Sequence, residues 1–164
     1  MVNVWFKKKK KEAELDQAVY APVTGECQDI TTASDPVFAQ KMMGDGFLVH
    51  PNSGSVVAPV AGEITVQQGH ALGIKRADGL EFLLHIGIDT VSLKGAPFTQ
   101  HVGVKDVVNP GDLLVDVDWQ QIKDANLDSS VMVIITNTND LLAQLEVKYG
   151  NVSAGAKVGT ATAK

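Results

Sequence analysis

The sequence has little of what defines several large classes of protein. Its 164 residues include one cysteine, Cys27, which cannot form a disulfide within the chain and is consistent with a reducing compartment. No apolar run is long enough to cross a bilayer, and the basic N-terminus lacks the apolar segment and cleavage site of a secretory signal. Long helical periodicity is also absent. We therefore expect a cytoplasmic protein with a buried cysteine and little helix.

The composition is that of one globular domain. Hydrophobic residues make up 45% of the chain and charged residues 20%, and the length allows a sizeable core. From Tyr20 onward, valine, glycine and short alternating segments are interrupted by frequent turn signals, which predicts an all-β sandwich or barrel. The net charge is −5, and five of the 14 basic residues lie at 7–11. The rest of the chain is therefore acidic, which disfavours nucleic acid and favours basic protein partners.

The first seventeen residues differ from the rest. We predict a basic flexible tail over 1–17 and a single domain over 18–164. The apolar residues between Val2 and Phe6 precede the run Lys7 to Lys11, a pattern that suits a weak anchor on an anionic membrane surface, peripheral to the cytoplasm. A solvated, disordered tail is the alternative interpretation.

An internal repeat supports the β assignment. The six residues APVTGE at 21–26 recur as APVAGE at 58–63, so two similar β units are expected to pack together. Two short helices are predicted, at 35–44 after the N-cap Asp35 and at 119–125 after Asp118. The apolar run 131–135 is typical of a strand buried on both faces.

Two histidines flank a predicted hairpin whose central turn is Asp78-Gly79. Pairing the arms about that turn gives a register with three informative pairs: Arg76 opposite Glu81, Ile74 opposite Leu83, and Leu72 opposite His85. Side chains alternate along a strand, so this register places His70, Leu72 and Ile74 on the face of His85 and leaves Phe82, Leu84 and Ile86 for the core. His70 is then diagonal to His85, within reach of its ring. A slip of one residue would separate the histidines.

The paired histidines have two chemical interpretations. Apolar neighbours disfavour the imidazolium form, so both rings should be neutral near pH 7 and act as nucleophiles or metal ligands. With a phosphoryl group as electrophile, one ring attacks phosphorus while the other donates an N–H to an oxygen. Zinc hydrolysis is the alternative, but a catalytic zinc normally has three protein ligands, and neither His50 nor His101 lies in a zinc motif. A biotinyl or lipoyl carrier is excluded, because Asp78-Gly79 occupies the hairpin tip where a lysine is needed.

Several segments together resemble one family. They are DPVFAQKMMGDG (35–46), VVAPVAGE (56–63), HALGI (70–74), LLHIGIDTVSLKG (83–95) and PGDLL (110–114). In this order they resemble the glucose-type enzyme IIA (EIIA) of the bacterial phosphoenolpyruvate-dependent sugar phosphotransferase system. The resemblance implies a compact antiparallel β-sandwich with internally similar halves, which acts as a phosphocarrier without a required cofactor.

The resemblance also implies roles for individual residues. His85 would accept a phosphoryl group at Nε2 from the histidine phosphocarrier protein HPr and pass it to a cysteine of an EIIB domain, while His70 would hydrogen-bond that group. In some relatives the equivalents of His70 and His85 also bind zinc. Asp35 and Asp89 match acidic rim positions that face an arginine of the donor.

Three further residues, Phe38, Met42 and Met43, fall in the family's apolar docking collar. Gln68 replaces a threonine that usually lies two residues before the upstream histidine, and its amide is expected to take over the threonine's hydrogen-bonding role.

Overall fold

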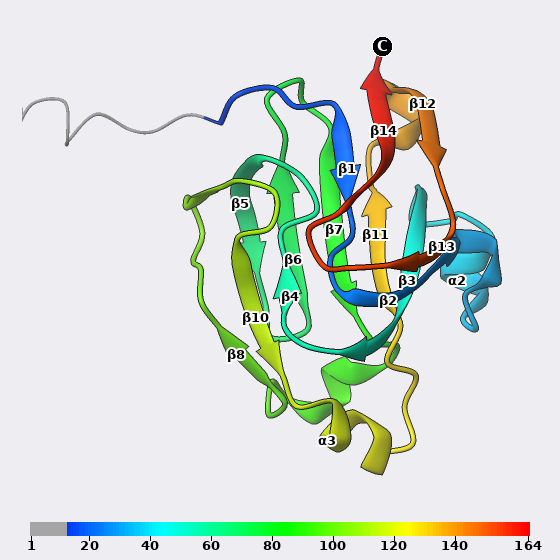
Figure 1. The fold of residues 1–164 in the computed structure, drawn as a ribbon, viewed down its shortest axis with the longest axis vertical. Coiled ribbons are helices and arrows are strands. Elements are labelled where there is room, and N and C mark those ends of the chain that lie inside the picture. The colour runs from blue at the N-terminus through cyan, green and yellow to red at the C-terminus, as the bar shows by residue number, and fades with distance from the viewer. Residues whose placement is uncertain (1–12) are drawn as a thin grey trace, which may run out of the picture.

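The computed structural model describes residues 13–164, which form a β-sandwich (Figure 1). One layer is an eight-stranded antiparallel sheet with strand order β13-β2-β3-β11-β7-β6-β5-β9, and two three-stranded sheets, β1-β14-β12 and β4-β10-β8, form the other. The strands are β1 (Ala18–Tyr20), β2 (Thr24–Asp29), β3 (Asp45–Ser53), β4 (Val56–Val57), β5 (Gly62–Gln67), β6 (Ala71–Lys75), β7 (Glu81–Ile86), β8 (Phe98–Gln100), β9 (Val107–Val108), β10 (Leu113–Val117), β11 (Val131–Ile135), β12 (Leu142–Val147), β13 (Gly150–Val152) and β14 (Lys157–Ala163). The predicted antiparallel sandwich is confirmed.

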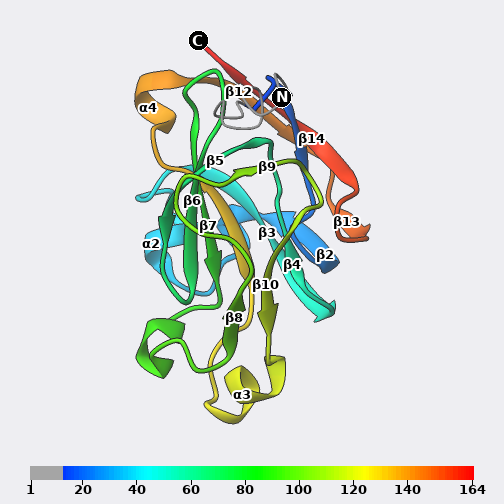
Figure 2. The ribbon, with the colours of Figure 1, turned by 90° about the vertical axis from the view of Figure 1, so that its left-hand side faces the viewer.

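The helices are short and lie between strands. They are η1 (Ile30–Thr32), α2 (Pro36–Ala39), η2 (Thr90–Leu93), α3 (Trp119–Asp124) and α4 (Thr138–Leu141). The helix predicted at 35–44 is shorter than expected, because Lys41 takes a left-handed φ of 60° that stops helical propagation. Figure 2 shows α3 and α4 at opposite ends of the molecule, with η2 at the end that carries α3.

The two halves of the sandwich repeat one another in hydrogen bonding as well as in sequence. Gly111 N donates to Ala58 O, and Gly155 N donates to Ala21 O, each at 2.9 Å. Exchanging β2 with β5, β3 with β6, β11 with β7 and β13 with β9 reverses the strand order of the large sheet and leaves it otherwise unchanged. The predicted similarity of the halves is therefore confirmed, and its approximate twofold axis passes between β7 and β11.

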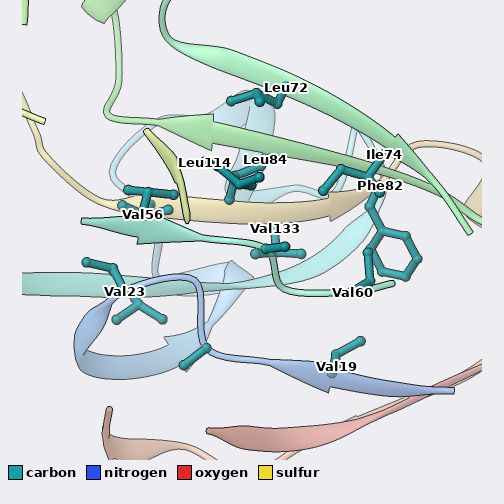
Figure 3. Packing of buried hydrophobic residues seen from close by; sticks show 14 of the residues in the cluster. Val19, Val23, Val56, Val60, Leu72, Ile74, Phe82, Leu84, Leu114 and Val133 are labelled. Carbon is teal, nitrogen blue, oxygen red and sulfur yellow. The ribbon is translucent and has the colours of Figure 1, made fainter. Parts of the chain in front are cut away.

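The main core lies between the two layers. Figure 3 shows ten of its labelled members, drawn from both layers: Val19, Val23, Val56, Val60, Leu72, Ile74, Phe82, Leu84, Leu114 and Val133. A second cluster lies on the outer face of the large sheet, where η1 and α2 cover it, and contains Ile30, Phe38, Leu48, Ile88, Met132 and Ile134. Alternate residues of β11 enter the two clusters, which confirms that this strand is buried on both faces.

The predicted register of the β6–β7 hairpin is wrong by one residue. Lys75 lies opposite Glu81, Leu72 opposite Leu84, and Ala71 opposite His85. The connection is the five-residue loop 76–80, an odd number, because the buried Arg76 folds back onto Asp78. Arg76 donates to both carboxylate oxygens of Asp78, at 3.0 and 2.7 Å. It also donates to the carbonyl oxygen of Ala161 in β14.

The changed register moves two side chains. Leu72 and Ile74 point into the main core beside Leu84 and Phe82 (Figure 3). The prediction that Leu72 and Ile74 share the face of His85 is therefore wrong. Their absence from that face means that other residues make the surroundings of the histidine pair apolar.

Most of the N-terminal segment for which a tail and a membrane anchor were predicted lies outside the described residues. The proposed membrane anchor, Val2 to Lys11, lies wholly outside them, and so does most of the predicted tail 1–17. Asp16 accepts hydrogen bonds from Ala18 N and Tyr20 Oη, and Gln17 O accepts one from Ala161 N. These two residues are thus attached to the body of the domain. Over the part of the chain described, no helix is long and apolar enough to span a membrane.

Candidate functional site

His85 lies near the end of β7, on the outer face of the large sheet. Its neighbours across the sheet are Ala71 on β6 and Met132 on β11. The Phe38 ring, held by α2, lies with its centroid 5.2 Å from that of His85. Phe38 is 7% exposed and belongs to the second cluster, so the apolar wall of the site comes from the segment between β2 and β3.

His70 lies beside His85, with ring centroids 5.0 Å apart and planes at 77°. The prediction that the rings lie side by side is confirmed, although the register behind it is wrong. Strand alternation would put His70 on the opposite face from Ala71 and therefore from His85. It does not apply, because His70 precedes β6 and lies in a bend, with its carbonyl accepting from Ile86 N at 2.8 Å.

The loop after β7 fixes the orientation of His85. The Nδ1 atom of His85 lies 2.7 Å from the carbonyl oxygen of Gly87. A carbonyl can only accept a hydrogen bond, so Nδ1 carries a proton and, in the neutral ring, Nε2 carries the lone pair. Gly87 has a φ of 76°, and the buried Thr90 donates its hydroxyl to Ile86 O, which closes the loop.

Burial lowers the pKa of both histidines below the ordinary histidine value. For His85, burial has the largest effect and the neighbouring His70 adds to it. The bond to Gly87 O and the carboxylates of Asp35 and Asp89 raise the pKa of His85 in opposition, without reversing the shift. For His70 burial alone lowers the pKa. Both rings are therefore neutral at pH 7, as expected for a nucleophile and its neighbour.

The carboxylates of Asp35 and Asp89 are close enough to His85 for their negative charge to raise its pKa. Asp35 caps α2 by accepting from Val37 N at 2.9 Å. Asp89 has a left-handed φ of 62° and begins η2 without a side-chain cap, which leaves its exposed carboxylate available at the rim. Their proposed contact with an arginine of a partner remains a prediction.

The apolar collar is only partly as expected. Met42 and Met43 are exposed, at 70% and 38%, whereas Phe38 is buried against His85. Two exposed valines were missed: Val37 on α2 and Val91 on η2. The position of Val91, two residues after Asp89, was the signal that could have identified it.

Support for the His70 loop comes from an unexpected residue. Gln68 is exposed, and within residues 13–164 its side chain makes no hydrogen bond to His70. The amide nitrogen of Gln100 on β8 instead donates to Gly69 O at 2.8 Å and to Gln68 O at 3.3 Å. No local sequence signal could have linked Gln100 to a loop about thirty residues earlier in the chain, because only tertiary packing brings them together.

The other two histidines lie elsewhere. His50 contacts Gln28 and Ser130, and His101 contacts Asp116. In the described part of the chain, no three His, Cys, Asp or Glu residues form a group that could hold a metal ion. His70 and His85 offer two nitrogen ligands, and residues 13–164 supply no third to complete such a group.

Comparison with known proteins gives consistent matches. Residues 17–141 match the family model of the phosphoenolpyruvate-dependent sugar phosphotransferase system, EIIA 1. The chain is 47% identical over 156 residues to a glucose-specific EIIA component from Halalkalibacterium halodurans, covering 90% of each chain. It is 47% identical over 139 residues to one from Staphylococcus aureus, covering 82% of this chain and 84% of the relative. The solved glucose permease IIA from Mycoplasma capricolum is similar with a TM-score of 0.77 and 38% identity, over 87% of this chain and 93% of that one.

Proposed function

This chain belongs to the phosphoenolpyruvate-dependent sugar phosphotransferase system EIIA 1 family, and on that basis we propose that His85 is its phosphoryl acceptor. The chain is an EIIA phosphocarrier, and by family role its partners are HPr and an EIIB domain. The observation that carries the assignment of His85 is its 2.7 Å bond from Nδ1 to Gly87 O. That bond leaves the Nε2 lone pair free on a neutral ring beside His70.

The first transfer forms a bond between His85 Nε2 and phosphorus while the P–N bond of the donor phosphohistidine breaks. Positive charge develops on the His85 ring, which keeps its Nδ1 proton, and the Gly87 carbonyl stabilises that charge. The neutral His70 ring donates an N–H to a phosphoryl oxygen. Apolar neighbours such as Phe38 keep water from the phosphohistidine.

The second transfer reverses the electron flow at His85. A cysteine thiolate of the EIIB domain attacks phosphorus, and the P–N bond electrons return to Nε2. Because the curated relatives are named as glucose-specific, we assign glucose as the sugar whose uptake this transfer drives, with both transfers in the cytoplasm.

The rim around the pair is the proposed docking surface. Asp35 and Asp89 supply negative charge for an arginine of HPr, and exposed apolar residues surround them. These are Val37, Met42, Met43 and Val91. A neutral, apolar centre with an acidic rim suits a partner that must exclude water and then dissociate.

Substitution of each histidine tests these roles. With phosphoenolpyruvate, enzyme I and HPr, the His85→Ala protein should gain no phosphoryl group by intact mass or radiolabel. His70→Ala should still be labelled but should pass the group to an EIIB domain on the order of a hundredfold more slowly. His101→Ala is the matched control, because the His101 ring is exposed and paired with Asp116. Labelling of His85→Ala would refute the assignment.

The zinc hydrolase is the weaker alternative, since a catalytic zinc normally has three protein ligands and the pair supplies two. It predicts stoichiometric zinc and turnover that a chelator abolishes, whereas phosphoryl acceptance should proceed in chelator.

Residues 2–11 are proposed as a weak contact with anionic lipid. Deleting residues 1–12 should lower binding to anionic vesicles at low salt and leave phosphoryl acceptance unchanged. Equal vesicle binding by the two proteins would eliminate this contact.

A further inference from the structure

A carboxylate outside every recognised motif lies next to the His85 loop. Asp128, in the segment between α3 and β11, accepts three hydrogen bonds: from Ser130 N at 2.8 Å, Ser130 Oγ at 2.7 Å and Ser34 Oγ at 2.7 Å. Burial opposes its ionisation, but the bonds from Ser130 and Ser34 outweigh burial and hold the pKa of Asp128 below its ordinary value. It is therefore a charged, multiply bonded side chain at neutral pH.

The backbone of the same segment carries the loop that orients His85. Asp128 O accepts from Ile88 N at 2.9 Å, and Ser130 O accepts from Gly87 N at 2.8 Å. The carbonyl of Gly87 in turn accepts the Nδ1 proton of His85. By fixing the turn between 128 and 130, the Asp128 carboxylate fixes the two carbonyls that hold the Gly87 peptide.

The third bond of Asp128 leads to the rim of the site. Ser34 immediately precedes Asp35, the cap of α2, and α2 carries the Phe38 ring that packs against His85. Ser34 and Asp128 are 94 residues apart in the chain. One carboxylate thus connects the loop that orients the acceptor with the segment that presents the acidic and apolar rim.

His50 completes this cluster from β3. Ser130 Oγ donates to Asp128, and His50 Nδ1 lies 3.1 Å from the same hydroxyl oxygen. The Nε2 atom of His50 lies 3.2 Å from the Gln28 side chain. His50 therefore links Ser130 with Gln28 on the neighbouring strand β2.

We propose that Asp128 is a positioning residue for phosphoryl transfer, which sets the tautomer of His85 through Gly87 and aligns the docking rim through Ser34. The proposal rests on His85 being the acceptor. Hydrogen bonds to an ionised group are stronger than those between neutral groups, and three of them hold the turn at 128–130 in one arrangement. Without that carboxylate, the Gly87 carbonyl loses its fixed direction, and part of the His85 population takes the tautomer with the proton on Nε2.

Three variants test separately the hydrogen bonds that Asp128 accepts from Ser130 and from Ser34. Asp128→Ala removes all three side-chain bonds. In Asp128→Asn the amide oxygen can still accept from Ser130, but the amide nitrogen cannot accept from Ser34. Ser34→Ala removes the connection to the rim alone. The matched control is Asp116→Asn, because Asp116 also accepts from a serine hydroxyl, that of Ser55, and contacts a histidine, His101, at an exposed site.

The first measurement is nitrogen-15 NMR of the His85 ring without any phosphoryl donor. The wild type and Asp116→Asn should show a protonated Nδ1 and an unprotonated Nε2, and Asp128→Ala should show a substantial Nε2-protonated fraction. Protection of the Gly87 and Ile88 amides from hydrogen exchange should fall in the same variant. Asp128→Asn and Ser34→Ala, which are milder changes, allow the comparison even if Asp128→Ala does not fold.

The second measurement is the rate of phosphoryl acceptance as a function of phospho-HPr concentration. We expect the maximal rate to fall about tenfold or more in Asp128→Ala. Asp128→Asn and Ser34→Ala should raise the half-saturating HPr concentration several-fold, with the maximal rate of Ser34→Ala near that of the wild type.

The outcomes distinguish failure of the positioning role of Asp128 from failure of His85 as the phosphoryl acceptor. A wild-type tautomer and wild-type rates in Asp128→Ala, or unchanged HPr dependence in both milder variants, would overturn the role of Asp128. Failure of the wild type to carry phosphorus on His85 would instead overturn the proposed function, and the tautomer measurement, which needs no donor, would still report on the loop.

Discussion

Replacing Gly87 with alanine should damage stability and phosphoryl acceptance together. Gly87 has a φ of 76°, a conformation that costs an L-residue roughly 1–2 kcal/mol. An added Cβ would lie 2.4 Å from Thr90 Cγ2 and 2.9 Å from the carbonyl oxygen of Asp128. Thr90 is fully buried and hydrogen-bonded to Ile86 O, so neither atom can move aside at low cost.

The loss of stability is the sum of the strain of the left-handed backbone and the clash of the added Cβ. Overpacking of this kind costs about 1–3 kcal/mol, so the free energy of unfolding should fall by roughly 2–5 kcal/mol in total. If the loop moves to relieve the clash, the Gly87 carbonyl moves with it and the Nδ1 proton of His85 loses its acceptor. We therefore expect phosphoryl acceptance to fall at least tenfold in the folded fraction, since a misplacement of about 1 Å can cost a hundredfold.

Gly111 provides the control for backbone strain. It has a φ of 88°, and an added Cβ would meet nothing within 4 Å. In Gly111→Ala the free energy of unfolding should therefore fall only by the cost of the left-handed backbone, about 1–2 kcal/mol. Phosphoryl acceptance should stay at the wild-type rate. Urea denaturation measures the stability of both variants, and a radiolabel time course with phospho-HPr measures acceptance. Equal destabilisation by the two substitutions, or a normal rate for Gly87→Ala, would refute the reasoning.

Four further predictions concern titration and buried groups. The pKa values of His85 and His70 lie below the ordinary value of about 6.5, so acceptance should stay constant down to that pH and fall only below it; a decline centred at or above pH 6.5 would contradict this. Unfolded rings bind protons that the folded rings do not, so stability should also decrease as pH falls from about 6.5, which denaturation at several pH values can measure. Arg76→Met leaves the partly buried Asp78 carboxylate without its ion pair, and should cost about 3 kcal/mol and lower Tm by roughly 6–12 °C in a thermal melt; a change below about 1 kcal/mol would show that this pair is dispensable. Burial raises the pKa of Cys27 to about 11, so alkylation followed by mass spectrometry should detect almost no modification until the protein unfolds, and rapid native labelling would contradict its burial.

Much of the architecture could be read from local sequence. Short alternating segments separated by turns predicted the antiparallel sandwich, and the repeat of 21–26 at 58–63 predicted two similar halves. The run 131–135 predicted a strand buried on both faces, because five consecutive apolar residues leave no polar face for solvent. The candidate histidines were also identifiable, because HALGI at 70–74 and LLHIGIDTVSLKG at 83–95 both resemble segments of the same family. These signals can be read from short segments of sequence, without knowing how distant segments pack together.

The arrangement of the site depended on tertiary structure. The hairpin register could not be counted from Asp78-Gly79, because a buried Arg76 lengthens the loop to an odd number of residues. His70 faces His85 because it lies outside β6, where alternation no longer governs its direction. Gln100 and Asp128 support the two histidine loops from distant parts of the chain. Local sequence identified the residues that we propose carry the chemistry, whereas their orientation was decided by buried hydrogen bonds between segments that only folding brings together.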